Sequence, residues 1–328
     1  MSAGSDWPIT IADVLEARRR LAPHLSPTPL RRYQPLDEAV GSGITVFVKH
    51  ENHNPTNSFK VRNTLSAMSA LSAEARSRGV VGATRGNHGL GMAYAGSLLR
   101  VPVTICVPLG NNPEKNEGMR GYGATLVEEG RDYDESLGVA QRLVAERGLT
   151  MLHSTNDRSV IAGAATLSLE MIEEAPDLEA VVVAIGGGSQ AVGAMTVMRA
   201  VKPEVEVFGV AASRAPAGHD SWRAGKIVAA ASADTFADGL ATRTAYALTF
   251  PALKAGLADF VLCTEAEIAA AVRLLLKTTH NLSEGAGAAG LAGLLKLRER
   301  LAGRKVAVIL SGGNMDARTL QQVASGQL

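Results

Sequence analysis

Residues 51–60, Glu51-Asn52-His53-Asn54-Pro55-Thr56-Asn57-Ser58-Phe59-Lys60, decide how this chain is interpreted. The β-branched run Ile44–Val48 comes before them and predicts a buried strand. Asn54-Pro55 breaks that strand, because the residue before a proline disfavours regular helix and the proline lacks an N–H. A side chain among Thr56–Ser58 is expected to cap a helix that begins near Phe59.

Lys60 therefore lies in the first turn of the predicted helix. The N-terminal end of a helix carries positive potential, so a lysine amine there should be easier to deprotonate. A neutral amine can form a Schiff base with an aldehyde. A lone lysine is more often a solvated surface residue, so the interpretation of Lys60 depends on the rest of the chain.

Composition excludes several classes of protein. The 328 residues include 33 basic and 32 acidic side chains, a balance that indicates neither a nucleic-acid-binding face nor a charged tail. The polar start, Met1 to Pro8, does not resemble a signal peptide, and no apolar run reaches the roughly 18–20 residues of a membrane span. Cys106 and Cys263 lie in apolar, strand-like runs and are expected to be buried thiols. We expect a soluble cytoplasmic protein without a metal cluster.

Beyond Lys60 the chain alternates short apolar runs with helical periods. This alternation with short links predicts an α/β fold with mostly parallel sheets. The stretch Ser213–Leu240 is the least regular and is expected to carry a loop over the site. Helices are expected at 11–21, 59–74, 88–98, 113–121, 133–147, 160–174, 191–200, 265–276 and 285–301, and strands at 44–48, 79–84, 101–107, 124–128, 149–153, 180–185, 205–211, 260–264 and 305–310.

The glycine-rich run Ile185-Gly186-Gly187-Gly188-Ser189-Gln190 follows an apolar strand and opens a helix. Consecutive glycines let backbone N–H groups converge on an anion, and the helix N-terminus adds positive potential. The run also satisfies a dinucleotide fingerprint, but that fingerprint expects an acid at the end of the next strand, which here ends Val210-Ala211-Ala212-Ser213. A small phosphate group therefore fits this loop better than a dinucleotide.

Two further loops carry polar side chains at the ends of predicted strands. Thr84-Arg85-Gly86-Asn87-His88-Gly89 offers free N–H groups for a carboxylate, and Asn87 offers an amide donor. His88 could be catalytic, although a structural role is the commoner one for a single histidine at a helix start. Ser311-Gly312-Gly313-Asn314 adds a hydroxyl. A Schiff-base lysine, a phosphate loop and two polar loops together describe pyridoxal 5'-phosphate, a cofactor with an aldehyde, a phosphate and a polar ring.

In order and spacing, a set of motifs that covers nearly the whole chain resembles the fold type II pyridoxal-phosphate enzymes, in the branch of the threonine/serine dehydratases and serine racemase. This family has two open, mostly parallel sheets with helices on both faces. Within it, residues 51–56 and 110–116 are similar to a dehydratase subgroup linked to hydroxyectoine utilisation. The motifs are Asn57-Ser58-Phe59-Lys60, Gly86-Asn87-His88, Val160-Ile161-Ala162-Gly163, Gly186-Gly187-Gly188-Ser189, Ala237-Asp238-Gly239, Glu284 and Leu310-Ser311-Gly312-Gly313-Asn314.

The resemblance implies a role for each site. Residues 1–76 and 153–328 would form a large cofactor-binding domain and 77–152 a small domain, with the active site between them. Lys60 would hold the cofactor as a Schiff base and serve as the catalytic base on the α-carbon. The implied cofactor contacts are Lys60, Phe59, Asn87, Gly186, Gly187, Gly188, Ser189, Glu284 and Ser311. The implied substrate-binding residues are Thr84, Arg85, Gly86, Asn87 and His88.

The resemblance also implies a reaction, the β-elimination of a β-hydroxy amino acid such as L-threonine or L-serine to a 2-oxo acid and ammonia. Ser311 would face the pyridine nitrogen, where a neutral hydroxyl suits elimination. A homodimer is a family expectation. Metal-binding members have a glutamate where this chain has Ala211, so no metal is expected. A C-terminal regulatory domain, found in the long biosynthetic members, is not expected either.

One position departs from the racemase-like pattern. Arg85 stands where those members have a serine that acts as the second acid/base, and a guanidinium stays cationic. We therefore expect elimination rather than racemisation. Arg85 could clamp a second anionic group of the substrate, as in 3-hydroxyaspartate or a hydroxyectoine-derived compound, or it could bind only the α-carboxylate or point to solvent.

Two other functions stay open on the sequence alone. A β-replacement synthase of the same fold would trap the intermediate with a thiol or amine nucleophile instead of releasing a 2-oxo acid. A non-catalytic regulator that binds pyridoxal phosphate would show the chromophore without turnover, although intact Lys60 and Ser311 argue against it.

Overall fold

The computed structural model describes residues 7–328. Residues 1–6, part of the segment in which no signal peptide is expected, lie outside the described range. The helices are α1 Ile11–Leu21, α2 Gln34–Val40, α3 Lys60–Ser69, α4 Ala73–Arg78, α5 Asn87–Leu99, α6 Pro113–Gly121, α7 Tyr133–Arg147, α8 Arg158–Glu174, α9 Ser189–Val201, α10 Ala217–Ala224, α11 Phe250–Gly256, α12 Glu265–Thr279, α13 Gly285–Leu297 and α14 Ala317–Ala324, with short 3₁₀ turns η1 Glu51–His53 and η2 Asp238–Leu240. The strands are β1 Leu30–Arg32, β2 Thr45–His50, β3 Val80–Ala83, β4 Val103–Val107, β5 Thr125–Glu128, β6 Thr150–Met151, β7 Ala180–Ala184, β8 Glu206–Ala212, β9 Asp259–Cys263 and β10 Lys305–Leu310.

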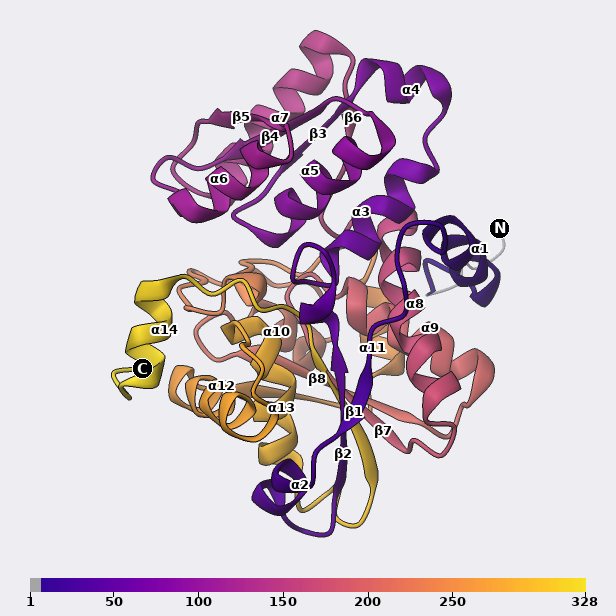
Figure 1. Cartoon of the computed structure of the whole chain (residues 1–328), viewed down its shortest axis with the longest axis vertical. Helices are drawn as coiled ribbons and strands as arrows, with labels where there is room; N and C mark the ends of the chain where they lie inside the picture. Colours follow the sequence, from indigo (N-terminus) through magenta and orange to yellow (C-terminus); the bar gives the residue numbers. More distant parts are fainter. Residues whose placement is uncertain (1–6) are drawn as a thin grey trace.

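The strands form two sheets. The larger has the order β1-β2-β10-β7-β8-β9 and is parallel except for β1, which pairs antiparallel with β2. The smaller is wholly parallel, with the order β5-β4-β3-β6. Figure 1 shows the smaller sheet and its helices as one layer above the larger, with α3 running between them. The predicted α/β fold of two mostly parallel sheets is confirmed, and the exact domain limits at 76/77 and 152/153 stay a prediction.

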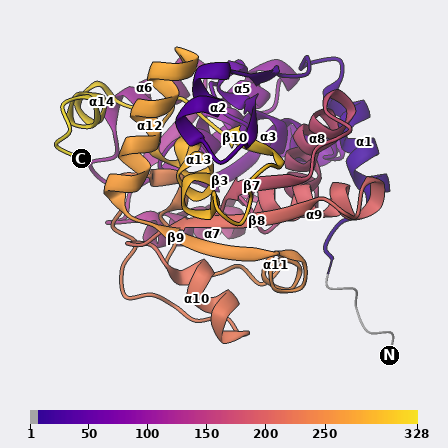
Figure 2. The same ribbon diagram turned by 90° about the horizontal axis from the view of Figure 1, so that it is seen from below.

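Alternating residues along the central strands explain why helices cover both faces of the larger sheet. On β10, Val306 and Val308 pack into one apolar cluster with α12 and α13, whereas Ala307 and Ile309 pack into a second with α8 and α9. A strand whose two faces are both buried has a nearly continuous apolar sequence, as β10 does. Figure 2 shows α10 beside β9, the last strand of this sheet.

The smaller sheet is covered in the same way. Ile105 on β4 lies in an apolar cluster with α5, α6 and α3, and the next residue, Cys106, lies in a cluster with α7. Cys106 and Cys263 are both buried and free, as predicted. No helix among residues 7–328 is long and apolar enough to cross a membrane.

Most predicted elements appear within one to three residues of their expected bounds, but the helix expected at 59–74 was wrong in its extent. It ends at Ser69, and α4 begins separately after Ser72, whose hydroxyl accepts a hydrogen bond from the N–H of Ala75. A serine N-cap starts a new helix because its side chain satisfies one of the free N–H groups. The helix expected at 285–301 likewise ends at Leu297.

Several short elements were not predicted, namely β1, α2, α10, α11 and α14. One of them, α10, lies within the stretch Ser213–Leu240 that was expected to be irregular. The later part of that stretch, from Ala231 onwards, lines the cavity described below, which confirms the predicted loop over the site.

Candidate active site

The residues that precede Lys60 are held by the turn that follows β10. The N–H of Phe59 donates to the carbonyl of Ser311 over 3.0 Å, and Ser58 forms an isolated β-bridge with Gly312. The predicted side-chain cap among residues 56–58 is therefore wrong, since α3 starts after Phe59 without one. This pairing places Lys60 at the carboxyl end of the larger sheet, where ligands of open α/β sheets bind.

The amine of Lys60 points into the interior of the site. Its Nζ donates a hydrogen bond to the carbonyl of Ser154 over 3.0 Å and lies 5.0 Å from the centroid of the Phe59 ring. Removal from water lowers the pKa of Lys60 to about 8 from the ordinary 10.5, because burial disfavours the charged form. The predicted ease of deprotonation agrees in direction, but its main cause is burial rather than the helix dipole.

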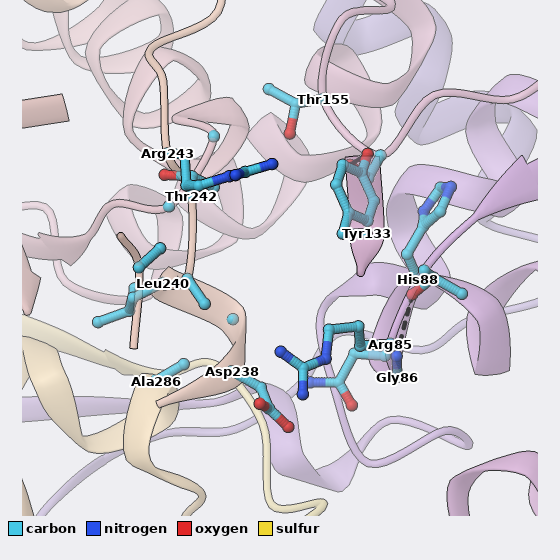
Figure 3. Close-up of a pocket in the computed structure, with 18 of the residues that line it drawn as sticks. Arg85, Gly86, His88, Tyr133, Thr155, Asp238, Leu240, Thr242, Arg243 and Ala286 are labelled. Atoms are coloured by element: carbon cyan, nitrogen blue, oxygen red, sulfur yellow. Dashed lines mark hydrogen bonds between the residues drawn. The ribbon is translucent and has the colours of Figure 1, made fainter. Parts of the chain in front are cut away.

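A cavity of about 630 Å³ opens around this amine, between the two sheets. Figure 3 shows it lined by side chains from both layers, with Arg85 and His88 from the smaller one and Leu240 and Ala286 from the larger. Every residue predicted to hold cofactor or substrate lines this one cavity. They are Phe59, Lys60, Thr84, Arg85, Gly86, Asn87, His88, Gly186, Gly187, Gly188, Ser189, Glu284 and Ser311.

The glycine loop Gly186–Ser189 has the geometry that an anion needs. Gly188 has φ +94°, which favours glycine, and Ser189 begins α9. A Cβ on Gly187 would lie 2.2 Å from Oγ1 of Thr155, so this position accepts only glycine. The buried amide nitrogen of Gln190, which also lines the cavity, has no hydrogen-bond partner among the described residues. Free N–H groups, a helix N-terminus and an unpaired amide fit a phosphate group.

A hydrogen-bonded chain fixes the side of the cavity opposite the glycine loop. The amide of Asn87 donates to Oε1 of Glu284 over 2.6 Å and accepts from the amide of Asn314 over 2.7 Å. Burial raises the pKa of Glu284 to about 7, although the charge of Lys115 and the Asn87 hydrogen bond oppose this shift. Ser311 presents its hydroxyl nearby at the end of β10. The chain holds the Asn87 amide in one orientation, as a ring-hydroxyl contact requires.

The loop after β3 carries a buried histidine that is neutral near neutral pH. The N–H of Gly86 donates to Oγ1 of Thr84 over 3.0 Å, which ties the loop to itself. His88 is buried, and its Nε2 lies 3.1 Å from the carbonyl of Leu152. Burial, together with the charge of Lys60, lowers the pKa of His88 to about 3. A permanently neutral imidazole bound to a backbone carbonyl supports the structural role for His88.

Sequence reasoning missed a group of cavity residues. Two ion pairs cross the cavity from the smaller layer: Lys115 binds Asp238 over 2.7 Å, and Arg243 binds Asp134. Asp238, Lys115 within residues 110–116 and Gln190 in the glycine-rich run were quoted as parts of motifs without a role, and no pattern in the chain marks the others. The missed residues that line the cavity include Lys115, Asp132, Tyr133, Asp134, Ser154, Thr155, Gln190, Asp238, Arg243 and Tyr246.

Comparison with known proteins agrees with this geometry. A family model described as pyridoxal-phosphate dependent enzyme matches residues 21–312. The chain belongs to this family. Pyridoxal phosphate is therefore its cofactor, as predicted, and the fold is of type II.

Relatives within the pyridoxal-phosphate family carry several named activities. L-threonine ammonia-lyase of Geobacter sulfurreducens is 38% identical over 94% of this chain and 77% of the relative. L-threo-3-hydroxyaspartate ammonia-lyase of Saccharomyces cerevisiae is 32% identical over 97% of both chains. A solved structure of maize serine racemase has a TM-score of 0.92 at 29% identity and covers 98% of both chains.

The predicted relationship to threonine and serine dehydratases is confirmed by these comparisons. The finer placement beside a hydroxyectoine-linked subgroup stays a prediction. The homodimer and the cytoplasmic location also stay predictions.

Proposed function

We propose that this protein eliminates the β-hydroxyl of a β-hydroxy amino acid, such as L-threonine or L-serine, as water, and that hydrolysis of the dehydrated product gives a 2-oxo acid and ammonia. The observation that carries the proposal is the position of Lys60. Its amine, with a pKa lowered to about 8, lies in the same cavity as a phosphate-binding glycine loop and a fixed Asn87 amide. The relatives named threonine ammonia-lyase or dehydratase support this reaction.

Residues of the larger layer, together with Asn87 from the smaller layer, would hold the cofactor. The N–H groups of Gly186–Ser189 would bind the phosphate, Asn87 the ring hydroxyl and Ser311 the ring nitrogen, with Phe59 against the ring. Pyridoxal phosphate supplies, when bound, an electron-poor ring that takes up negative charge from the substrate's α-carbon. Ser311 is a neutral partner for that ring and so does not favour a long-lived negative charge, which suits the departure of a β-hydroxyl.

Lys60 would act as the base. Near neutral pH, an amine with a pKa of about 8 is partly unprotonated, so it can accept the α-proton of a bound amino acid. The hydrogen bond to the Ser154 carbonyl keeps Nζ on one side of the cavity. Arg85, His88 and Asn87 cannot replace it, because they are respectively always cationic, too weakly basic with a pKa of about 3, and not titratable.

The smaller layer would bind the substrate. Helix α5 begins at Asn87, and its first N–H groups have no acceptor within the helix, so they can bind an α-carboxylate. The loop Thr84–His88 brings these groups to the cavity. We accordingly propose that residues 77–152 form the substrate-facing small domain.

The test is an assay of the protein loaded with pyridoxal phosphate against a panel of β-hydroxy amino acids, with ammonia and 2-oxo acid both measured. Lys60→Ala should lose the Schiff-base absorbance and turnover, whereas Lys226→Ala, an exposed lysine outside the cavity, should retain both. Incorporation of an added thiol without 2-oxo acid release would favour the β-replacement synthase. A bound chromophore with no turnover on any substrate would favour the regulator.

A further inference from the structure

Some of the charged side chains that line the cavity form ion pairs with one another. Lys115 binds Asp238, and Arg243 binds Asp134 and Asp132. Arg85 also lines the cavity, but it makes no hydrogen bond or ion pair with any residue in the described range 7–328. A guanidinium remains charged at every physiological pH, so Arg85, which is exposed, is a cation without an ion-pair partner in the described range and within reach of a bound substrate.

The position of Arg85 separates it from the groups that would bind an α-carboxylate. Arg85 precedes the N-cap residue Gly86, so the first N–H groups of α5 lie beyond it in the chain. In Figure 3 its guanidinium extends towards Asp238, away from Tyr133 and Thr155. The α-carboxylate of an amino acid can use the helix N-terminus and still leave Arg85 free.

Acidic side chains line the cavity, but none of those in the described range forms an ion pair with Arg85. Lys115, whose side chain is only 12% exposed, lies against Gly86 and reaches Asp238. Burial raises the pKa of Glu284, another acid that lines the cavity, to about 7, so a substantial share of that carboxyl is uncharged near neutral pH. Asp238, towards which Arg85 extends, is already paired with Lys115, so a substrate anion can pair with Arg85. A planar carboxylate suits a guanidinium, because it accepts two parallel hydrogen bonds.

We propose that Arg85 is a specificity residue that selects β-hydroxy amino acids with a second anionic group, of the 3-hydroxyaspartate type. This inference rests on the proposed elimination and names its substrate class. Arg85 binds the distal carboxylate, and the N-terminus of α5 binds the α-carboxylate. The residue takes no part in proton transfer. That a yeast relative is named for 3-hydroxyaspartate shows that the fold accommodates such a compound, but the assignment to Arg85 comes from its unpaired charge.

The first arm of the test compares substrates. The loaded wild-type protein, Arg85→Gln and the control Arg223→Gln are assayed with threo-3-hydroxyaspartate, threonine and serine. Arg223 is exposed on α10 outside the cavity and loses the same charge. The ratio of kcat/KM for hydroxyaspartate to that for threonine should fall about 10- to 100-fold in Arg85→Gln, the effect of losing a hydrogen-bonded charge, and should not change in Arg223→Gln. An unchanged ratio in Arg85→Gln overturns the proposal.

The second arm is independent of turnover. Binding of succinate and of propanoate to the same three proteins is measured by calorimetry. Succinate should bind the wild-type and Arg223→Gln proteins more tightly than propanoate does, and Arg85→Gln should lose that preference. Equal binding of the two acids to the wild-type protein refutes the role of Arg85. If no β-hydroxy amino acid yields a 2-oxo acid, the proposed elimination is wrong. The binding measurements still decide whether Arg85 binds a second carboxylate.

Discussion

Replacement of Arg62 by methionine should destabilise the protein more than almost any other single change at an ion pair. The side chain of Arg62 is 2% exposed and makes short ion pairs with Glu51 over 2.8 Å and Glu170 over 2.6 Å. Its guanidinium also bonds Oγ1 of Thr28. Lys49 is fully buried and binds the same Glu170 over 2.8 Å. The cluster connects the N-terminal segment, β2, α3 and α8 below the surface.

The magnitude follows from what the substitution leaves behind. Glu51 is fully buried, and without Arg62 it keeps only the Thr28 hydroxyl, the Asn54 amide and the more distant charge of Lys49. Removal of one partner from a buried ion pair costs about 3–5 kcal/mol, because the remaining charge is uncompensated. Since whole domains are stable by about 5–15 kcal/mol, this loss is a large share of the free energy of unfolding.

Urea unfolding at pH 7, followed by circular dichroism, measures the effect. Arg142→Met is the matched control, because Arg142 pairs with Glu129 at the surface, with about half of each side chain exposed, and should cost only about 0.2–1 kcal/mol. The double variant Arg62→Met/Glu51→Gln should recover part of the loss, since it no longer buries an unpaired charge. A loss below about 1 kcal/mol in Arg62→Met would refute the reasoning.

The difference in the free energy of unfolding between the wild-type protein and Arg62→Met should also depend on pH. The nearby charge and hydrogen bonds of Arg62 outweigh burial and lower the pKa of Glu51 below the ordinary 4.5. A depressed carboxyl pKa stabilises the folded protein above the unfolded pKa, and this contribution is lost as pH falls through the folded value. The difference in the free energy of unfolding between wild type and Arg62→Met should therefore become smaller as pH falls below 4.5.

Three further predictions concern the cavity. The rate at which the apo-protein forms a Schiff base with pyridoxal phosphate, followed by absorbance, should reach half of its maximum near pH 8, because burial lowers the pKa of Lys60 to about 8. A half-maximal rate near pH 10.5 would contradict this. Gly187→Ala should weaken cofactor binding strongly in an equilibrium titration, because its Cβ would meet Thr155 at 2.2 Å. Gly138 is exposed in the middle of α7 with open space around it, so Gly138→Ala should instead bind the cofactor as the wild-type protein does and gain about 0.5–1 kcal/mol of stability. His88 should show no titration between pH 5 and 8 by NMR, since its pKa is about 3.

Local patterns predicted the site well where its residues end strands. The glycine run at 186–188, the loop Thr84–His88 and Ser311 all follow apolar runs in the chain, and parallel strands bring such ends to one edge. A ligand-binding loop of this kind depends on local sequence, because a strand must end and a helix must begin with small residues between them. This is why the cavity contains every residue predicted to hold cofactor or substrate.

Features that depend on distant contacts could not be predicted. The absence of a side-chain cap before Lys60 reflects pairing of Ser58 with Gly312, more than two hundred residues away. The ion pair between Lys115 and Asp238 exists only because the two layers face each other across the cavity. Burial around Lys60, which has more effect on its amine than the helix end, is likewise a property of the assembled fold.

The arrangement of the two sheets has a consequence for how such proteins diversify. Under the proposed roles, the larger layer and Asn87 retain the cofactor, and the rest of the smaller layer chooses what is bound beside it. Mutations at Arg85 or Lys115 can then alter substrate choice while Asn87, the glycine loop and Ser311 stay untouched. A lineage can explore new substrates through the smaller layer as long as Asn87 is kept, and a designer can exchange the loop after β3 between relatives that share this asparagine.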